Sequence, residues 1–290
     1  MSQRPPSTLV ADVRRARLDA ELVRRRLARS REHAAELIAS ARVTVSGQTA
    51  VKAATAVDPD APLVVKPDVG DEDWASRGAH KLIGALDAFG DVRIRGRRCL
   101  DAGASTGGFT DVLLRRGAAE VVAVDVGYGQ LIWRLQNDDR VRVHDRTNVR
   151  SLTPDVIGGR VQLTVSDLSF ISLTLVLPAL LACTDPGGDL VLMVKPQFEV
   201  GRQRLGAGGV VRDPALRADA VAGVVAAAAA LNWGLAAVTA SPLPGPSGNV
   251  EYFVHLRSED VQVCAPQAGR GTGQPTVQER IAAAVAGGPA

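Results

Sequence analysis

Along the first sixty residues, the spacing of the hydrophobic positions changes once, from a helical period to a period of two. Apolar side chains within residues 17–28 recur three or four positions apart, which predicts an amphipathic helix. A second set within 34–41 has the same spacing, and Ser30 ahead of it is suited to cap a helix N-terminus. From Val43 to Val51 the period becomes two around a Ser-Gly turn, which predicts a hairpin. The pattern therefore indicates a compact α+β module.

Residues 57–73 contain three prolines and six acidic residues without periodicity, which predicts a linker. A helix is expected at 75–88, followed by short apolar strands that alternate with helical stretches and by a short helix at 277–285. Such alternation predicts a Rossmann-like α/β domain, with a mostly parallel sheet covered on both faces. The last strand follows a loop without a helix, so we expect it to run antiparallel. The predicted strands are 98–100, 121–126, 141–143, 161–165, 190–194, 235–240 and 250–256.

Composition narrows the class of protein. The chain has 290 residues and is 46% hydrophobic, enough for one substantial core and a second small domain. The longest apolar stretch, 220–231, is too short to span a membrane, and the first ten residues lack the apolar centre of a signal peptide. Three separated cysteines suggest neither a disulfide framework nor a thiolate metal site. These features favour a cytoplasmic protein without stable membrane association.

Charge is distributed unevenly. Residues 1–55 carry eleven cations against five acids, a net charge of +6, whereas the whole chain has +3, which leaves −3 for the rest. A basic module joined to a mildly acidic body is expected when the module docks on phosphate. Lysine is rare beside arginine, at four residues out of 34 cations, and two of the four, Lys81 and Lys195, lie outside the basic runs. A lysine can lose its proton and act as a base, which arginine cannot.

A glycine-rich loop follows the first predicted strand of the α/β domain and turns directly into a helix. Small residues there let a ligand approach the backbone, and Asp125, at the end of the next strand, can accept both hydroxyls of a ribose. The opening Asp101 repels phosphate but suits a cationic amino-acid group, so S-adenosylmethionine fits better than a nicotinamide dinucleotide. The candidate cofactor-binding residues are Asp101, Gly103, Ala104, Ser105, Thr106, Gly107, Gly108, Phe109, Asp125, Val126 and Asp167.

Four further residues could reach the same crevice. Asp167 and Lys195 each follow a predicted strand, at the end where open α/β sheets bind ligands. Glu251 is a carboxylate at the start of an otherwise apolar strand, and Lys81 comes from the helix before the first strand. Each alone is more simply explained as a solvated charge. Together at these positions, the four form a candidate catalytic constellation.

Two resemblances give these patterns a context. The N-terminal segment, with Arg17-Leu18-Asp19, Ser30-Arg31 and Val43-x-Val45-x-Gly47, resembles the ribosomal-protein S4-like RNA-binding domain. That resemblance implies that Arg15, Arg17, Arg31 and Lys52 bind structured RNA. The module contains no aromatic residue, which argues against stacking on single strands.

The remaining motifs, 76–82, 101–109, 167–172, 195–199 and 245–252, resemble the TlyA family of rRNA 2'-O-methyltransferases, related to the FtsJ type. This resemblance implies a class I methyltransferase fold, a catalytic tetrad of Lys81, Asp167, Lys195 and Glu251, S-adenosylmethionine as cofactor, and cytidine ribose in 16S or 23S rRNA of the 30S or 50S subunit as substrate. The expected division is a tail at 1–13, an S4-like domain at 14–57, a linker at 58–75, the methyltransferase domain at 76–258 and a tail at 259–290.

In the mechanism that this implies, Lys195 meets the ribose 2'-hydroxyl, as a base if neutral or as a stabiliser of the developing alkoxide if charged. The target nucleotide is expected to swing out of its stack. Phe170 and Phe198, each beside a tetrad residue, either hold its base or belong to the core.

Competing functions make different demands on the sequence. A non-catalytic assembly factor would let the tetrad decay, yet it is complete. A membrane-active haemolysin needs an apolar or amphipathic inserting segment, and none is evident. A dehydrogenase is disfavoured by the loop chemistry. The four histidines do not pair at metal-ligand spacing, so no metal is expected, and the pattern does not indicate an oligomeric state.

Overall fold

The computed structural model describes residues 15–66 except 26 and 29, residues 74–258 except 246, and residues 275–288. The chain divides into two compact units, residues 1–73 and 74–290. The expected tail at 1–13 lies outside the described residues.

The first unit is a small α+β module. Ser30 caps α2, because its Oγ accepts a hydrogen bond from the His33 backbone N–H at 3.1 Å, which confirms the predicted cap. Leu18 and Leu22 of α1 are fully buried against α2 and the strands. The elements are β1 (Ala16–Arg17), α1 (Leu18–Arg24), α2 (Arg31–Ala39), β2 (Val43–Val45), β3 (Gln48–Thr49), β4 (Ala56–Val57) and β5 (Leu63–Val65).

Strand β5 lies within the stretch expected to be a linker. It pairs antiparallel with β2, whose other edge pairs with β3, while β1 pairs with β4. Residues 58–66 are therefore part of the first unit, and the expectation of a linker does not hold for them. A run of three apolar residues, Leu63-Val64-Val65, is too short to show a period, which is why its pairing was not predicted.

The second unit contains one seven-stranded sheet with the order β11-β12-β10-β9-β6-β7-β8. β12 pairs antiparallel with both of its neighbours, and the other pairs are parallel, so the predicted fold class and the antiparallel last strand are confirmed. The elements are α3 (Gly78–Phe89), β6 (Arg98–Ala102), α4 (Gly108–Arg115), β7 (Glu120–Val124), α5 (Trp133–Gln136), β8 (Val141–His144), β9 (Val161–Ser166), α6 (Leu173–Cys183), β10 (Thr184–Val194), α7 (Pro196–Glu199), α8 (Pro214–Ala229), β11 (Trp233–Ala240), β12 (Tyr252–Ser258) and α10 (Val277–Ala286).

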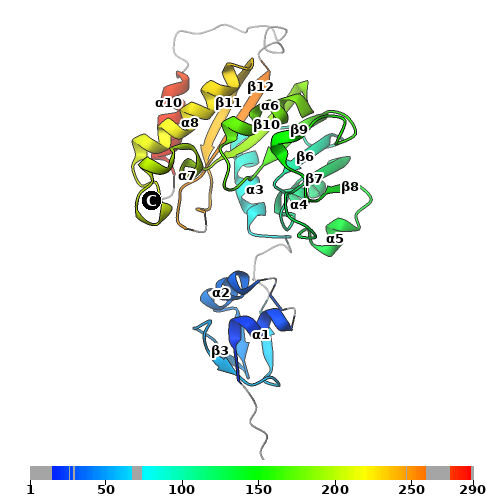
Figure 1. The fold of residues 1–290 in the computed structure, drawn as a ribbon, viewed down its shortest axis with the longest axis vertical. Coiled ribbons are helices and arrows are strands. Elements are labelled where there is room, and N and C mark those ends of the chain that lie inside the picture. The colour runs from blue at the N-terminus through cyan, green and yellow to red at the C-terminus, as the bar shows by residue number, and fades with distance from the viewer. Residues whose placement is uncertain are drawn as a thin grey trace, which may run out of the picture. The chain divides into compact units, whose positions relative to one another are not determined.

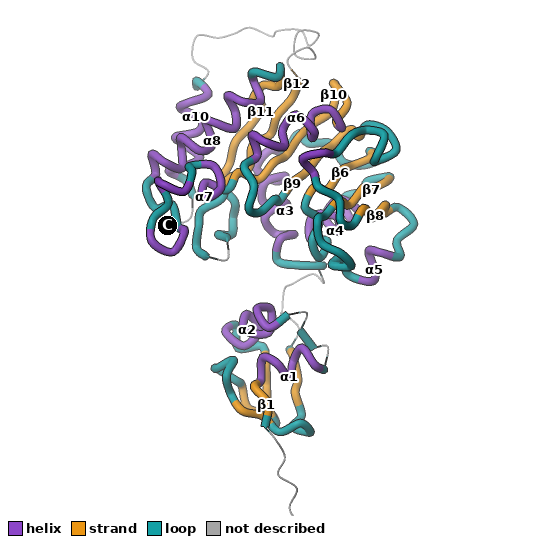
Figure 2. The backbone as a smooth tube through the Cα atoms, in the orientation of Figure 1, coloured by secondary structure: helices purple, strands orange, loops and turns teal. Residues whose placement is uncertain are grey.

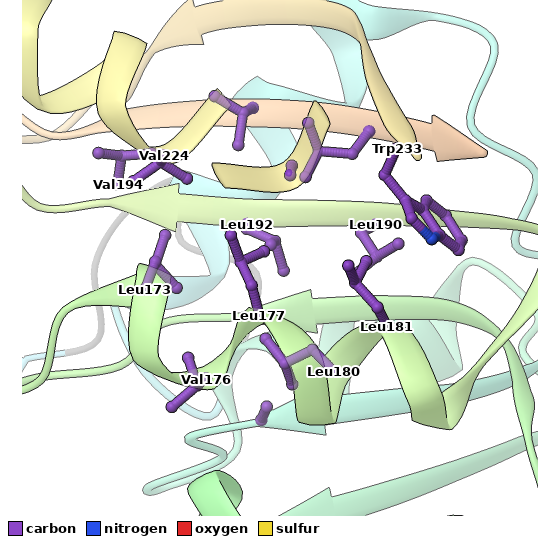
Figure 3. Packing of buried hydrophobic residues seen from close by; sticks show 14 of the residues in the cluster. Leu173, Val176, Leu177, Leu180, Leu181, Leu190, Leu192, Val194, Val224 and Trp233 are labelled. Atoms are coloured by element: carbon purple, nitrogen blue, oxygen red, sulfur yellow. The ribbon is translucent and has the colours of Figure 1, made fainter. Parts of the chain in front are cut away.

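Helices cover both faces of this sheet (Figures 1 and 2). Side chains of β10 alternate between the two layers, since Leu190 and Leu192 pack with α6, α8 and α10, whereas Val191 and Met193 pack with α3 and α4. Figure 3 shows leucines of α6, among them Leu177, lying against β10. Burial on both faces explains why these strands are continuous apolar runs.

The end of the chain that was expected to be a tail includes a docked helix. Helix α10 begins with a capping box between Thr276 and Glu279, and its Ile281 is 2% exposed within the core. Arg280 donates hydrogen bonds to the carbonyls of Leu235 and Ala236 on β11. Residues 275–288 thus complete one face of the sheet. Among the described residues, no helix is both long and apolar enough to cross a membrane.

Candidate active site

The predicted site residues gather at one edge of the sheet. Parallel strands β6, β9 and β10 are neighbours, and Asp101, Asp167 and Lys195 lie at or just after their carboxyl ends. Because β12 runs antiparallel, Glu251, just before its first residue, lies at the same edge. The strand order reverses between β6 and β9, and open α/β sheets bind ligands outside such a switch point.

Lys81 and Glu251 form a buried ion pair. Lys81 Nζ lies 2.6 Å from Glu251 Oε2, and the residues are 9% and 1% exposed. Helix α3 carries the lysine across the face of the sheet, so residues 170 positions apart meet. Glu251 Oε1 is buried without a hydrogen-bond partner. A Cβ on Gly245 would stand 2.6 Å from this oxygen, so the loop before β12 needs glycine there.

The second ion pair joins Lys195 and Asp167. The ammonium lies 2.6 Å from Asp167 Oδ1 and donates a hydrogen bond to Ser169 Oγ at 2.9 Å. Lys195 is 7% exposed, whereas 23% of the Asp167 side chain is exposed. The structure thus sorts the predicted tetrad into two lysine–carboxylate pairs, one enclosed and one open to solvent. Ser169, the second partner of Lys195, was not predicted.

The glycine loop between β6 and α4 depends on backbone freedom. Gly103 and Gly107 have φ of +91° and +101°, where side chains are strained. A Cβ on Gly103 would lie 2.7 Å from the Asp167 carbonyl oxygen, and one on Gly107 would collide with Leu131 and Leu135. The loop therefore packs closely against Asp167 after β9 and against the segment around α5.

Asp125, directly after β7, is held by the backbone. Its Oδ2 accepts from Ser105 N–H at 2.8 Å and its Oδ1 from Gly127 N–H at 2.7 Å. A carboxylate oxygen has two lone pairs, so each oxygen can still accept a hydrogen bond from a ribose hydroxyl. Val126 is 69% exposed beside it. The predicted ribose-binding position is thus fixed in orientation.

Asp101 is a buried carboxyl in β6, one residue before the strand ends. It is 1% exposed, its Oδ2 accepts from Thr110 Oγ1 at 2.6 Å, and its Oδ1 has no partner. Burial raises its pKa to about 7, and the nearby carboxylates of Asp167 and Asp125 act in the same direction. An unpartnered acid beside a glycine loop fits a cationic ligand group, which would supply both the missing donor and the missing charge.

Two aromatic residues each follow a member of the second ion pair by three positions. Phe170 is 91% exposed, with φ of +64°, and its ring centroid lies 5.4 Å from that of Phe198. A bulky residue in the left-handed region is strained, and such strain collects at functional sites. Phe170 is therefore not a core residue, which removes one of the two interpretations left open for it.

In the first unit, three of the four predicted RNA-binding cations have anionic partners. Arg17 and Arg31 both donate to the buried Asp19, at 2.9 and 3.0 Å, while their side chains stay 52% and 60% exposed. The hydrogen bond from Arg17 is the main cause of the lowered pKa of Asp19. Arg15 pairs with Asp58, and Lys52 is exposed. Asp19 thus fixes two guanidinium groups at the surface, a role that the sequence did not reveal.

Comparisons with known proteins place this geometry in a family. Residues 74–258 match the FtsJ-like methyltransferase family, and residues 16–62 match the S4 domain. The 16S/23S rRNA (cytidine-2'-O)-methyltransferase TlyA of Mycobacterium tuberculosis is 63% identical over 85% of this chain and 91% of its own length. The chain belongs to the TlyA family.

Other similar proteins include a 23S rRNA methyltransferase and a solved structure with a hemolysin title. The 23S rRNA (cytidine-2'-O)-methyltransferase TlyA of Campylobacter jejuni is 33% identical over 80% of this chain and 96% of its own length. A solved structure of a presumed hemolysin from Streptococcus thermophilus is 35% identical, covers 94% of this chain and 95% of its own, and has a TM-score of 0.72. Among the described residues of this TlyA-family chain, no cluster of three His, Cys, Asp or Glu could hold a metal ion.

Proposed function

We propose that this protein transfers a methyl group from S-adenosylmethionine to the ribose 2'-hydroxyl of cytidine in 16S and 23S rRNA, within ribosomal subunits in the cytoplasm. The observation that supports this most is the pairing of two buried lysines with two carboxylates at the edge that also carries the glycine loop. The relatives named above supply the substrate class, and the relative at 63% identity includes both rRNAs in its name.

The residues around the glycine loop fit S-adenosylmethionine. Asp101 would accept from the cationic amino-acid group, and Asp125 would accept from the ribose hydroxyls. Gly103 and Gly107 let the loop between them pack closely on the protein. When bound, the cofactor supplies an activated methyl group. The protein's remaining tasks are to orient the target hydroxyl and to manage its proton.

We assign Lys195 to the 2'-hydroxyl, because its carboxylate partner Asp167 is 23% exposed, whereas Glu251, the partner of Lys81, is 1% exposed. Asp167 and Ser169 hold the ammonium in place, at 2.6 and 2.9 Å. If neutral, Lys195 takes the hydroxyl proton; if charged, it stabilises the oxygen as negative charge develops. Lys81 and Glu251 are enclosed, so we assign them to orientation of the reacting groups and to the charge balance of the site.

The target base is proposed to leave its stack and lie against Phe170. A 2'-hydroxyl in a folded rRNA helix is not free for in-line attack, and enzymes that reach a stacked nucleotide swing it out. An aromatic ring 91% exposed beside the proposed reacting residues offers the stacking surface that RNA-binding proteins use. We propose that the S4 unit, through Arg15, Arg17, Arg31 and Lys52, supplies contacts to phosphate.

Substitution of Lys195 tests the assignment. Lys195→Ala should lower the methyl-transfer rate about 10²- to 10⁴-fold, the range for removal of an acid–base group. Lys195→Arg keeps the charge but cannot accept a proton, so near-normal turnover of this variant would contradict the base role and leave the electrostatic one. Calorimetric binding of S-adenosylhomocysteine should be unchanged in both variants, which shows that the site is folded. Full activity of Lys195→Ala would refute the assignment.

A further inference from the structure

Gln197 has an unexplained feature that the proposed reaction does not use. Its Oε1 is buried without a hydrogen-bond partner, as are Asp101 Oδ1 and Glu251 Oε1. The latter two belong to residues already assigned to the cofactor and the tetrad. Buried side-chain oxygens are nearly always satisfied, so an orphan acceptor on a residue that lines a pocket points to a donor that arrives with a ligand.

Gln197 lines a pocket beside the proposed reacting residues. It is the second residue of α7, two positions after Lys195, and the first turn is held by a 2.9 Å hydrogen bond from Phe198 N–H to the Lys195 carbonyl. Phe170, Phe198 and Leu205 form apolar walls of the same pocket. Apolar and aromatic walls with one amide match the environment in which proteins hold a splayed-out RNA base, with stacking on its face and hydrogen bonds at its edge.

We infer that Gln197 reads the Watson–Crick edge of the target base, with Oε1 accepting a hydrogen bond from the exocyclic amine of cytosine. The side-chain Nε2 can donate to cytosine N3 at the same time, which makes a two-bond contact. Uracil presents an acceptor in place of the amine and a donor at N3, so it matches Gln197 only if the amide turns over and Nε2 takes the place of the orphan oxygen. The inference rests on the proposed function and adds the residue that selects cytidine.

The test compares target nucleotides that differ only at the amine. A ribosomal subunit is reconstituted with synthetic rRNA that carries cytidine, or the 2-pyrimidinone ribonucleoside lacking the amine, at the methylated position. The full-length wild type should methylate cytidine with a kcat/KM about tenfold or more above that of the analogue, because a site built to bond a polar group rejects the analogue without it. Gln197→Leu should lose most of its rate on cytidine and methylate both nucleotides about equally.

The variants separate a reading role from a structural one. Gln197→Glu keeps an acceptor, so it should retain a preference for cytidine over the analogue despite a lower rate. Binding of S-adenosylhomocysteine by both variants reports an intact site. If Gln197→Leu keeps the wild-type ratio between the two nucleotides, or if the folded Gln197→Glu loses it, the inference is overturned. If the wild type methylates neither nucleotide, the proposed function itself fails.

Discussion

The buried carboxyl of Asp101 makes the stability of the second unit depend on pH in an unusual direction. The pKa of Asp101 is about 7 in the folded protein against 3.8 as the ordinary value, because burial disfavours its charge. Between these two values the folded state holds a proton that the unfolded state has lost, so stability falls as pH rises. Above pH 7 both states are ionised and the slope vanishes.

The magnitude follows from the pKa of about 7. From pH 5 to pH 7 the folded state holds about one proton more, and each pH unit is worth about 1.4 kcal/mol, so Asp101 should cost the wild type about 3 kcal/mol between pH 5 and pH 8. Asp101→Asn has no titrating group there. Any constant effect of the amide cancels when its free energy of unfolding is compared with that of the wild type at the two pH values.

Urea unfolding followed by tryptophan fluorescence measures this effect. The three tryptophans, Trp74, Trp133 and Trp233, all lie in the second unit, so the signal reports that unit. From pH 5 to pH 8, the free energy of unfolding of Asp101→Asn should rise by about 3 kcal/mol relative to that of the wild type. Asp111→Asn is the matched control: ion pairs lower the pKa of this buried carboxyl, so it is ionised in both states over this range. If the free energy of unfolding depends on pH in the same way for Asp101→Asn and for the wild type, the reasoning is refuted.

Three further results are expected. Asp111→Ala should lower the free energy of unfolding by about 1–3 kcal/mol in urea titrations, because it removes a buried carboxylate that accepts hydrogen bonds from Arg115 and Arg134, and an unchanged urea midpoint would contradict this. Leu177→Ala should lower it by about 2–5 kcal/mol through the cavity left between α6 and the sheet, and an unchanged urea midpoint would contradict that packing. Replacing Arg17 and Arg31 by Gln should make the plot of log binding constant against log salt concentration less steep, by the amount expected for the loss of about two phosphate contacts. Filter binding of rRNA from about 50 to 200 mM salt measures this slope, and an unchanged slope would exclude both arginines as phosphate ligands.

The sequence predicted the sheet because its strands are apolar runs separated by helical periods, and burial on both faces is what such runs require. All seven predicted strands are present in the described structure, although β10 begins at Thr184, six residues before the predicted start. The early part of β10 contains Gly187 and Gly188 and an irregular register against β9, so it lacks the apolar pattern of the rest. Segments without such a pattern, among them β5, depend on tertiary pairing that a local period cannot show.

The sequence predicted which residues form the site, but it did not predict which of them form ion pairs with one another. The carboxyl ends of parallel strands lie at one edge of a sheet, so the sequence alone predicted that Asp101, Asp167 and Lys195 lie close together. Which carboxylate each lysine contacts depends on the placement of α3 across the sheet, which no local pattern encodes. Gln197 lies in the 195–199 motif, but the sequence gave it no role, because only the structure shows that its side-chain oxygen lacks a partner. The catalytic roles of these residues stay predictions.

Methyl transfer to purified ribosomal subunits tests the central proposal most directly. Labelled S-adenosylmethionine is incubated with 30S and with 50S subunits and either wild-type protein or Lys195→Ala, and the product is located as dinucleotides resistant to nuclease through a 2'-O-methyl group. We expect label on cytidine ribose in both subunits with the wild type and its loss with the variant. Label on neither subunit, with rRNA binding intact, would contradict the proposed reaction and favour a role in subunit assembly.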